Sequence, residues 1–343
     1  MRVATLARLI LSGCLVSPAQ TGPEPRTFFH EKLGLSDAQI DRIARGQAIV
    51  KMLPSRTPAE IFVFGAVFVN ANPDEYIKFA FDMVRLRRLP GYLGVGRFSD
   101  PPLLSDLAGF TLEPGDIRDL KNCKPGSCTV QLPSAAMREI QTALDWSRPG
   151  AAAQVNARVR NMALDILQRY QNEGNRVLGI YRDSRRPFDV DAELRSLLGR
   201  AEALPVYLPE LNHYLLAYPN AIVANLESLF YWERVDFGLK PTLRLNHGMS
   251  YRTVGPHGTA HVVAMKQLYA SHYFQLALDL TVCVSGSSRA GQPGFYLITL
   301  KGSTQEGLTG FLGSVRRKIV VSKTLSAQEK ALLGIKQTLE EKR

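Results

Sequence analysis

The sequence predicts an α+β fold in which an antiparallel sheet packs on a long C-terminal helix, with a large, mainly helical insertion. Three observations lead to this prediction. Several segments after residue 226 alternate apolar and polar side chains with the period of two that half-buried strands show. A pattern with helical spacing follows these segments directly. Residues 134–217 carry further helical patterns.

Length and composition are those of a globular protein. The 343 residues are enough to bury a substantial core, as one large domain or two, and 45% of them are hydrophobic. The formal net charge of +11 favours anionic partners. After the first residues, no stretch approaches the ~20 consecutive apolar residues of a membrane span.

We interpret residues 1–19 as a signal peptide. Arg2 and Arg8 surround a short apolar run, and the small residues before and at Ala19 suit cleavage by a signal peptidase. The segment that ends at Cys14 also resembles a lipobox, so lipoprotein anchoring there is the alternative. Either route predicts a periplasmic or secreted protein.

Cysteine spacing agrees with export. Cys123 and Cys128 bracket the turn-forming tetrapeptide Lys-Pro-Gly-Ser, which predicts a disulfide bond in an oxidising compartment. A zinc site would need two further ligands, and none is adjacent. Cys283 lies in an alternating segment and is expected to be a small buried residue.

The N-terminal half of the chain divides into two predicted parts. Residues 20–58 form a helical segment opened by the capping box Ser36–Gln39, with Gln47–Leu53 either extended or helical. Residues 59–133 form the first part of the α+β domain. Its elements are a strand at Glu60–Val69, a helix entered through Asn72-Pro73, a short helix at Asp116–Asn122 and a strand at Thr129–Leu132.

The C-terminal half begins with the helical insertion, residues 134–225, and ends with strands and a helix in residues 226–343. Strands joined by turns favour an antiparallel sheet. They are predicted at Thr242–Arg252, His261–Gln267, Tyr273–Val284 and Phe295–Lys301.

The C-terminal helix is expected to cover the apolar face of this sheet. Its predicted buried stripe consists of residues spaced by three and four. Ser326–Glu329 has the spacing of a second capping box, so a helical piece is expected to begin there. The stripe comprises Leu308, Phe311, Leu312, Val315 and Ile319.

One strand-to-helix connection carries a family resemblance. Phe68-Val69-Asn70-Ala71-Asn72-Pro73-Asp74-Glu75-Tyr76, with Asp82 closing the helix, resembles the strand–Ala–Pro–acidic–aromatic entry of the START-like, polyketide-cyclase-related helix-grip superfamily. The resemblance covers residues 59–90 and 226–343 and implies a curved antiparallel sheet that holds an apolar ligand against a long helix. The helical insertion departs from the family pattern, and the family offers no shared catalytic set.

Five side chains are predicted to line the ligand cavity: Trp232, His247, Met249, Tyr251 and Phe274. His247 shares its strand face with Met249 and Tyr251, which we expect to meet the C-terminal helix. A polar group there must be hydrogen-bonded or costs about 1–3 kcal/mol. Two interpretations stay open, a satisfied core histidine and a polar contact inside the cavity.

Catalysis and metal binding are the less favoured hypotheses. Glu233, like His247, alternates in step with apolar residues of its own strand, so both are expected on a buried face. The two are therefore candidates for an acid–base pair. His257 and His261, with His247 or His272, would be the zinc ligands, but strand spacing does not place them on one face, so solvated histidines are expected. The sequence predicts no metal and no cofactor.

The leading prediction is an exported protein that binds a hydrophobic or lipid-like small molecule in a sheet–helix cavity without catalysis. One alternative is a hydrolase or isomerase that uses Glu233 and His247. The other is a cell-envelope interaction module that docks through residues 134–217. Basic clusters, including Arg316-Arg317-Lys318, also suit an anionic membrane surface. Nucleic-acid binding is disfavoured because no matching motif is present.

Overall fold

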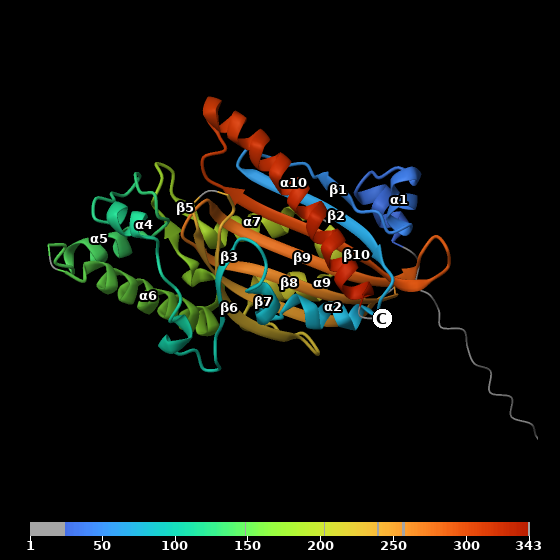
Figure 1. Cartoon of the computed structure of the whole chain (residues 1–343), viewed down its shortest axis with the longest axis horizontal. Coiled ribbons are helices and arrows are strands. Elements are labelled where there is room, and N and C mark those ends of the chain that lie inside the picture. Colours follow the sequence, from blue (N-terminus) through green and yellow to red (C-terminus); the bar gives the residue numbers. More distant parts are fainter. Residues whose placement is uncertain (1–24, 148, 202, 239, 256–257, 342–343) are drawn as a thin grey trace, which may run out of the picture.

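The computed structural model describes residues 25–341, apart from residues 148, 202, 239, 256 and 257. In this part of the chain, eight strands form one antiparallel sheet that does not close into a barrel (Figure 1). The predicted α+β fold is confirmed. The predicted signal peptide lies outside the described residues. In the order β1-β2-β10-β9-β8-β7-β6-β3, the strands are β1 (Ile49–Met52), β2 (Glu60–Val69), β10 (Pro293–Gln305), β9 (Phe274–Ser287), β8 (Gly258–Ala270), β7 (Thr242–Gly255), β6 (Glu227–Val235) and β3 (Tyr92–Arg97).

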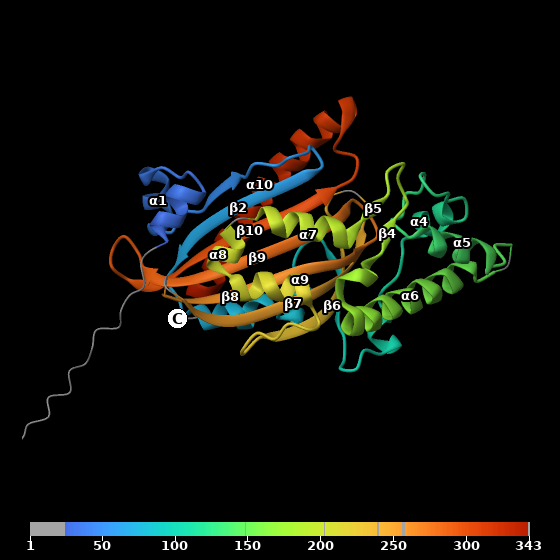
Figure 2. The same ribbon diagram turned by 180° about the vertical axis from the view of Figure 1, so that it is seen from behind.

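Helices cover both faces of the sheet. One face carries α10 (Gly310–Glu340), α2 (Pro73–Ala80) and the short α3 (Met83–Leu86), which lie in front in Figure 1. The opposite face, in front in Figure 2, carries α1 (Asp37–Ala44) and helices of the insertion. The insertion and the segment before it contain α4 (Pro114–Leu120), α5 (Ser134–Thr142), α6 (Ala151–Glu173), α7 (Val190–Arg200), α8 (Ala203–Tyr207) and α9 (Pro209–Ala217), with a small hairpin of β4 (Ile180–Tyr181) and β5 (Phe188–Asp189).

Strand β2 is apolar on both of its faces because it is covered on both. Phe64 and Phe68 point to the side where α1 packs. Val67 and Val69, one residue out of step, join the cluster that contains Leu332 of α10. A near-continuous apolar run is what a strand buried on both faces requires.

Helix α10 lies close to the sheet at Gly65 of β2. A β-carbon placed on Gly65 would come within 2.8 Å of Cδ1 of Leu332, so a larger residue would push the helix away. The amide of Gln328 donates a hydrogen bond to Oγ1 of Thr299 on β10, and that hydroxyl donates to the carbonyl of Gly65 at 3.1 Å. The C-terminal half of α10 is therefore fixed to β2 and β10, as the sequence predicted for a helix that covers the sheet.

Several boundaries differ from the sequence prediction. The segment left open at Gln47–Leu53 contains β1, and β3 was missed. Residues Thr129–Leu132 form no strand; the backbone N–H of Gln131 donates to the carbonyl of Ser271 at 2.8 Å in an isolated contact. The helix does not restart at Ser326, because α10 is continuous across that residue.

The predicted disulfide bond between Cys123 and Cys128 is confirmed, with the two Cα atoms 4.8 Å apart. Cys283 is a free, fully buried thiol on β9. None of the helices in the described ranges has the length and apolarity that crossing a membrane demands.

Candidate functional site

The apolar face of β7 packs against the helical insertion and not against α10. Leu245, Met249 and Tyr251 belong to the same buried cluster as Leu167 of α6 and Leu211 of α9. Helix α10 contacts β1 and β2, at the other end of the sheet and on its other face. The prediction that this face of β7 meets the C-terminal helix is therefore wrong. The apolar surfaces of the insertion helices cover this face of β7 instead of α10.

Trp232, which was predicted to line a cavity, fills space between β6 and the chain that precedes the insertion. Its indole N–H donates to the carbonyl of Asp106 at 2.7 Å. Its ring meets that of Phe110 edge-to-face at 5.9 Å between centroids. Trp232 is a packed side chain with its polar atom satisfied, and it holds the chain before α4 against the sheet.

Glu233 and His247 lie on opposite faces of the sheet. In the β6–β7 register Glu233 faces Arg244, whereas His247 faces Phe230. Glu233 and His247 each alternate in step with apolar residues of their own strand. Such alternation does not tell whether two residues on different strands lie on the same face until the pairing register of the strands is known. The hypothesis of a Glu233–His247 acid–base pair is therefore wrong.

Glu233 instead forms a buried ion pair on the side of α3. Nη1 of Arg244 lies 3.0 Å from Oε1 of Glu233, and Nε of Arg244 donates to Oε1 of Gln267 at 3.2 Å. Burial raises the pKa of Glu233, although the charge of Arg244 opposes this. Phe274 lies on this side too, 5.4 Å from the Arg244 guanidinium. Phe274 and His247 thus do not line one cavity.

His247 sits in a cluster of buried aromatic and polar side chains between β7, β8 and the insertion. Its Nδ1 lies 3.2 Å from the hydroxyl of Tyr170 on α6. The amine of Lys266 on β8 donates to that hydroxyl at 3.1 Å and to Oδ1 of Asn175. The ring of Tyr218 stacks on Tyr170 with centroids 4.7 Å apart. His247 and Lys266 are both 0% exposed.

Burial decides the protonation of this cluster. It lowers the pKa of Lys266 to about 7. Burial, and then the charge of Lys266, lowers the pKa of His247 well below its ordinary value. A neutral His247 that accepts the Tyr170 proton at Nδ1 carries its own proton at Nε2, which has no hydrogen-bond partner among the described residues. The cluster is an enclosed polar core, and of the two interpretations of His247 the core histidine fits this packing.

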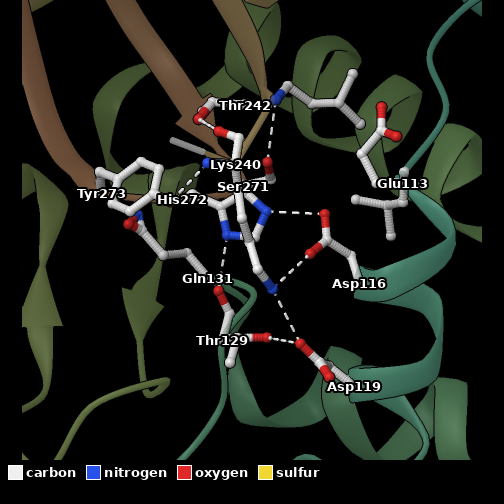
Figure 3. Close-up of polar contacts among 12 residues, drawn as sticks. Glu113, Asp116, Asp119, Thr129, Gln131, Lys240, Thr242, Ser271, His272 and Tyr273 are labelled. Carbon is white, nitrogen blue, oxygen red and sulfur yellow. Dashed lines mark hydrogen bonds and ion pairs between the residues drawn. The ribbon is translucent and has the colours of Figure 1, made fainter. Parts of the chain in front are cut away.

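A second polar network joins α4 and the chain after it, which precede the insertion, to the tip between β8 and β9 (Figure 3). Nε2 of His272 lies 2.9 Å from Oδ2 of Asp116 on α4, and its Nδ1 lies 2.7 Å from the carbonyl of Thr129. The amine of Lys240 reaches Oδ1 of Asp116 at 3.1 Å and Oδ2 of Asp119 at 3.0 Å. The segments that meet here are more than 100 residues apart in the chain.

Every polar group named in this network has a partner. Both ring nitrogens of His272 face oxygen atoms, those of Thr129 and Asp116. Burial alone would raise the pKa of Asp116, but the hydrogen bonds and charges of His272 and Lys240 hold it below its ordinary value. Lys240 thus bridges two carboxylates, Asp116 and Asp119. A satisfied network of this kind stiffens a junction.

Two of the candidate zinc-binding histidines have other partners in the described part of the chain. His272 is buried in the network of Figure 3, and Nδ1 of His261 lies 3.3 Å from Oδ1 of Asp74. The expectation that these two are solvated is wrong, since both are buried. His257 lies outside the described residues. Across the described part of the chain, no three His, Cys, Asp or Glu side chains gather in a way that suits a metal ion.

A pocket of about 390 Å³ lies where the first turns of α10 pass over the beginning of β2. Its floor continues into an apolar cluster that contains Ile61, Val63 and Leu325. Both of its charged lining residues are basic. The lining comprises Pro58, Leu308, Gly310, Ser314, Arg317, Lys318 and Val321.

Arg317 and Lys318 differ in how they are held. The guanidinium of Arg317 donates to the carbonyls of Pro58 and Glu60, the latter at 2.7 Å, and to Oγ of Ser55 at 3.1 Å. Arg317 therefore ties α10 to the entry of β2. Lys318 is exposed and is free to contact a ligand at the rim. The N-terminal end of a helix carries partial positive charge, which adds to these two cations.

A second pocket, of about 580 Å³, lies at the other end of α10 beside α1. Arg45, Arg289 and Lys336 line it together with Glu340. Both α1 and α10 end there, so two partly negative helix ends face these cations. The amine of Lys336 is also bound to Glu340. The cations at this end face the helix ends and the carboxylate. At the β2 end neither lining cation faces a carboxylate: Arg317 is held by neutral oxygens, and Lys318 is exposed.

Two signals for the missed residues were present in the sequence. Lys266 has the same parity as Val262 and Ala264, so it occupies an apolar face of β8. The run of cations at Arg316–Lys318 contains Arg317 and Lys318, which line the α10 pocket. Nothing local in the sequence pairs His272 with Asp116, because that contact depends on the tertiary fold alone.

We compared the chain with known proteins in three ways: no family model matches it, and no curated protein or solved structure does.

Proposed function

We propose that this chain is an exported protein that binds an anionic, lipid-like small molecule without catalysis, in the pocket between the beginning of β2 and the first turns of α10. The observation that carries the proposal is an apolar hollow in which both charged lining residues, Arg317 and Lys318, are basic. An apolar tail suits the floor of the pocket, and an anionic head suits the cations and the helix end.

The size of the pocket narrows the ligand class. A volume near 390 Å³ lies at the low end of the range of about 300–1,000 Å³ for small-molecule sites. A single-chain amphiphile such as a fatty acid therefore suits it better than a two-chain lipid. The START-like resemblance, which implies an apolar ligand under the C-terminal helix, agrees with this site and stays a prediction.

Export is supported by the disulfide bond between Cys123 and Cys128, because such bonds persist in oxidising compartments. Periplasmic or secreted location, and the choice between cleavage after Ala19 and lipidation at Cys14, stay predictions. The docking role of residues 134–217 also stays a prediction. It finds less support, since most apolar side chains of this segment are buried in the cluster that includes the sheet, although Val206 and Ile180 are exposed.

Binding of a fluorescent long-chain fatty acid to the purified mature chain tests the proposal. Val321→Trp should fill the pocket and abolish binding, whereas Leu333→Trp, on an exposed part of the same helix, should bind normally. The fatty alcohol of equal length should bind about tenfold more weakly, because it lacks the charge. Full binding by Val321→Trp would refute the site. Equal affinity for the alcohol would refute the anionic head.

A further inference from the structure

The N-terminal half of α10 presents two bulky apolar side chains to solvent. Val315 is 54% exposed and Ile319 is 53% exposed. They are four residues apart and so lie on one face of the helix. The sequence predicted that both would be buried in the stripe with Leu308, and this is wrong, because the helix turns Val320, Val321 and Leu325 toward the sheet instead.

Basic side chains flank this exposed apolar pair. Arg316, Lys318 and Lys323 are exposed, and residues 310–328 contain no Asp or Glu. At about 100° per residue, Lys318 lies roughly 60° to one side of Val315, and Lys323 and Arg316 lie roughly 80–100° to the other. The face is therefore apolar at its centre and positive on both margins.

This end of the helix stands clear of the rest of the molecule. In Figure 1 and Figure 2 the first turns of α10 project beyond the ends of the neighbouring strands. A flat partner can thus approach the face that carries Val315 and Ile319. By contrast, Arg317 points inward to Ser55 and the carbonyl of Glu60 and takes no part in this surface.

We propose that the N-terminal half of α10 docks on an anionic membrane surface. Val315 and Ile319 enter the headgroup–acyl boundary, while Arg316, Lys318 and Lys323 contact lipid phosphates. An amphipathic helix with cations beside its apolar face binds membranes in this way, by apolar burial together with attraction to anionic lipid. An acidic protein partner would satisfy the cations, but it would not by itself require apolar residues at the centre of the face.

The docking surface and the ligand pocket are neighbours that share only Lys318. Val315, Ile319 and Arg316 do not line the pocket, whereas Val321 does. The docking inference goes beyond ligand binding and holds whether or not a fatty acid occupies the pocket.

Vesicle sedimentation with the mature chain tests the docking surface. The protein should bind phosphatidylcholine vesicles that contain phosphatidylglycerol and not vesicles of phosphatidylcholine alone, and binding should weaken as salt rises. Ile319→Asp should weaken binding more than about tenfold. Arg316→Glu should weaken it about tenfold, since each cation near an anionic surface contributes roughly fivefold and the reversal adds repulsion.

Val206→Asp is the matched control, because Val206 is 65% exposed on α8, on the opposite face of the sheet, and it should bind like the wild type. The melting temperature of Ile319→Asp should be unchanged, which shows that the variant folds. Val321→Trp should keep vesicle binding even if it loses fatty acid. Equal binding of Ile319→Asp and the wild type would overturn the proposal. So would equal binding to both vesicle types, or a preference for acidic polypeptide or DNA that Ile319→Asp leaves intact.

Discussion

The two faces of the sheet are built from the same kind of strand but are covered in different ways. On the insertion face, helices and aromatic side chains bury the strand residues, including the polar side chains of His247 and Lys266. On the other face, α10 is anchored by its C-terminal half, while its N-terminal half leaves a pocket and exposed apolar residues. Alternating strands alone thus do not reveal where a pocket forms. The position of the pocket depends on how much helix covers each face of the sheet.

The largest expected effect is the pH dependence of stability that the buried amine of Lys266 on the insertion face causes. If water reached this face, the effect would be absent, and the two faces would not differ as described. Burial lowers the pKa of Lys266 from 10.5 to about 7. The unfolded chain therefore binds more protons than the folded chain between these pH values, and the free energy of unfolding rises with pH in that window. Below about pH 7, the burial of Lys266 lowers the free energy of unfolding by its full amount, on the order of 5 kcal/mol.

Denaturant titrations between about pH 7 and pH 9.5 check this. In Lys266→Met the rise of the free energy of unfolding with pH should largely disappear, because no amine remains to titrate. Lys323→Met, which removes an exposed amine, should keep the wild-type rise. An unchanged rise in Lys266→Met would mean that water reaches Lys266 and that the insertion face is not sealed.

A smaller change in stability is expected on the face that α10 covers. Its measurement tests whether the C-terminal half of α10 is anchored to the sheet. Leu332 is fully buried against β2, so Leu332→Ala should lower the free energy of unfolding by about 2–5 kcal/mol. Its neighbour Leu333 is exposed, and Leu333→Ala should change it by less than about 0.5 kcal/mol. Chemical denaturation measures both. Similar losses would show that α10 is not anchored as described.

The smallest effect concerns the junction between residues 114–132, which precede the insertion, and the sheet. Replacing both Cys123 and Cys128 by Ser should cost about 2 kcal/mol, since the closed loop is short. Amide hydrogen exchange should speed up in residues 114–132, which the disulfide and the network of Figure 3 hold, and stay unchanged in α10. Equal acceleration in α10 would show that the two sides of the sheet open together.

Much of the fold was predictable from short-range pattern. The alternation in β7 and β9 predicted strands, and the spacing of Cys123 and Cys128 predicted their disulfide bond. The sequence predicted a cavity between the sheet and the last helix, but none of the five residues it named for that cavity lines the pocket beside α10. The position of the pocket was not predictable, because strand parity gives two faces without saying which helix covers each. Thus His247 was assigned to the wrong helix.

The sequence by itself determined the α+β class, the helical insertion, the disulfide bond and the long last helix, because periodicity and turn chemistry act over a few residues. Tertiary structure alone decided that Glu233 and His247 face apart, that His272 meets Asp116, and that Val315 and Ile319 face solvent. Those outcomes depend on strand register and on which surfaces compete for the same apolar face. Both are set only when segments distant in the chain pack together.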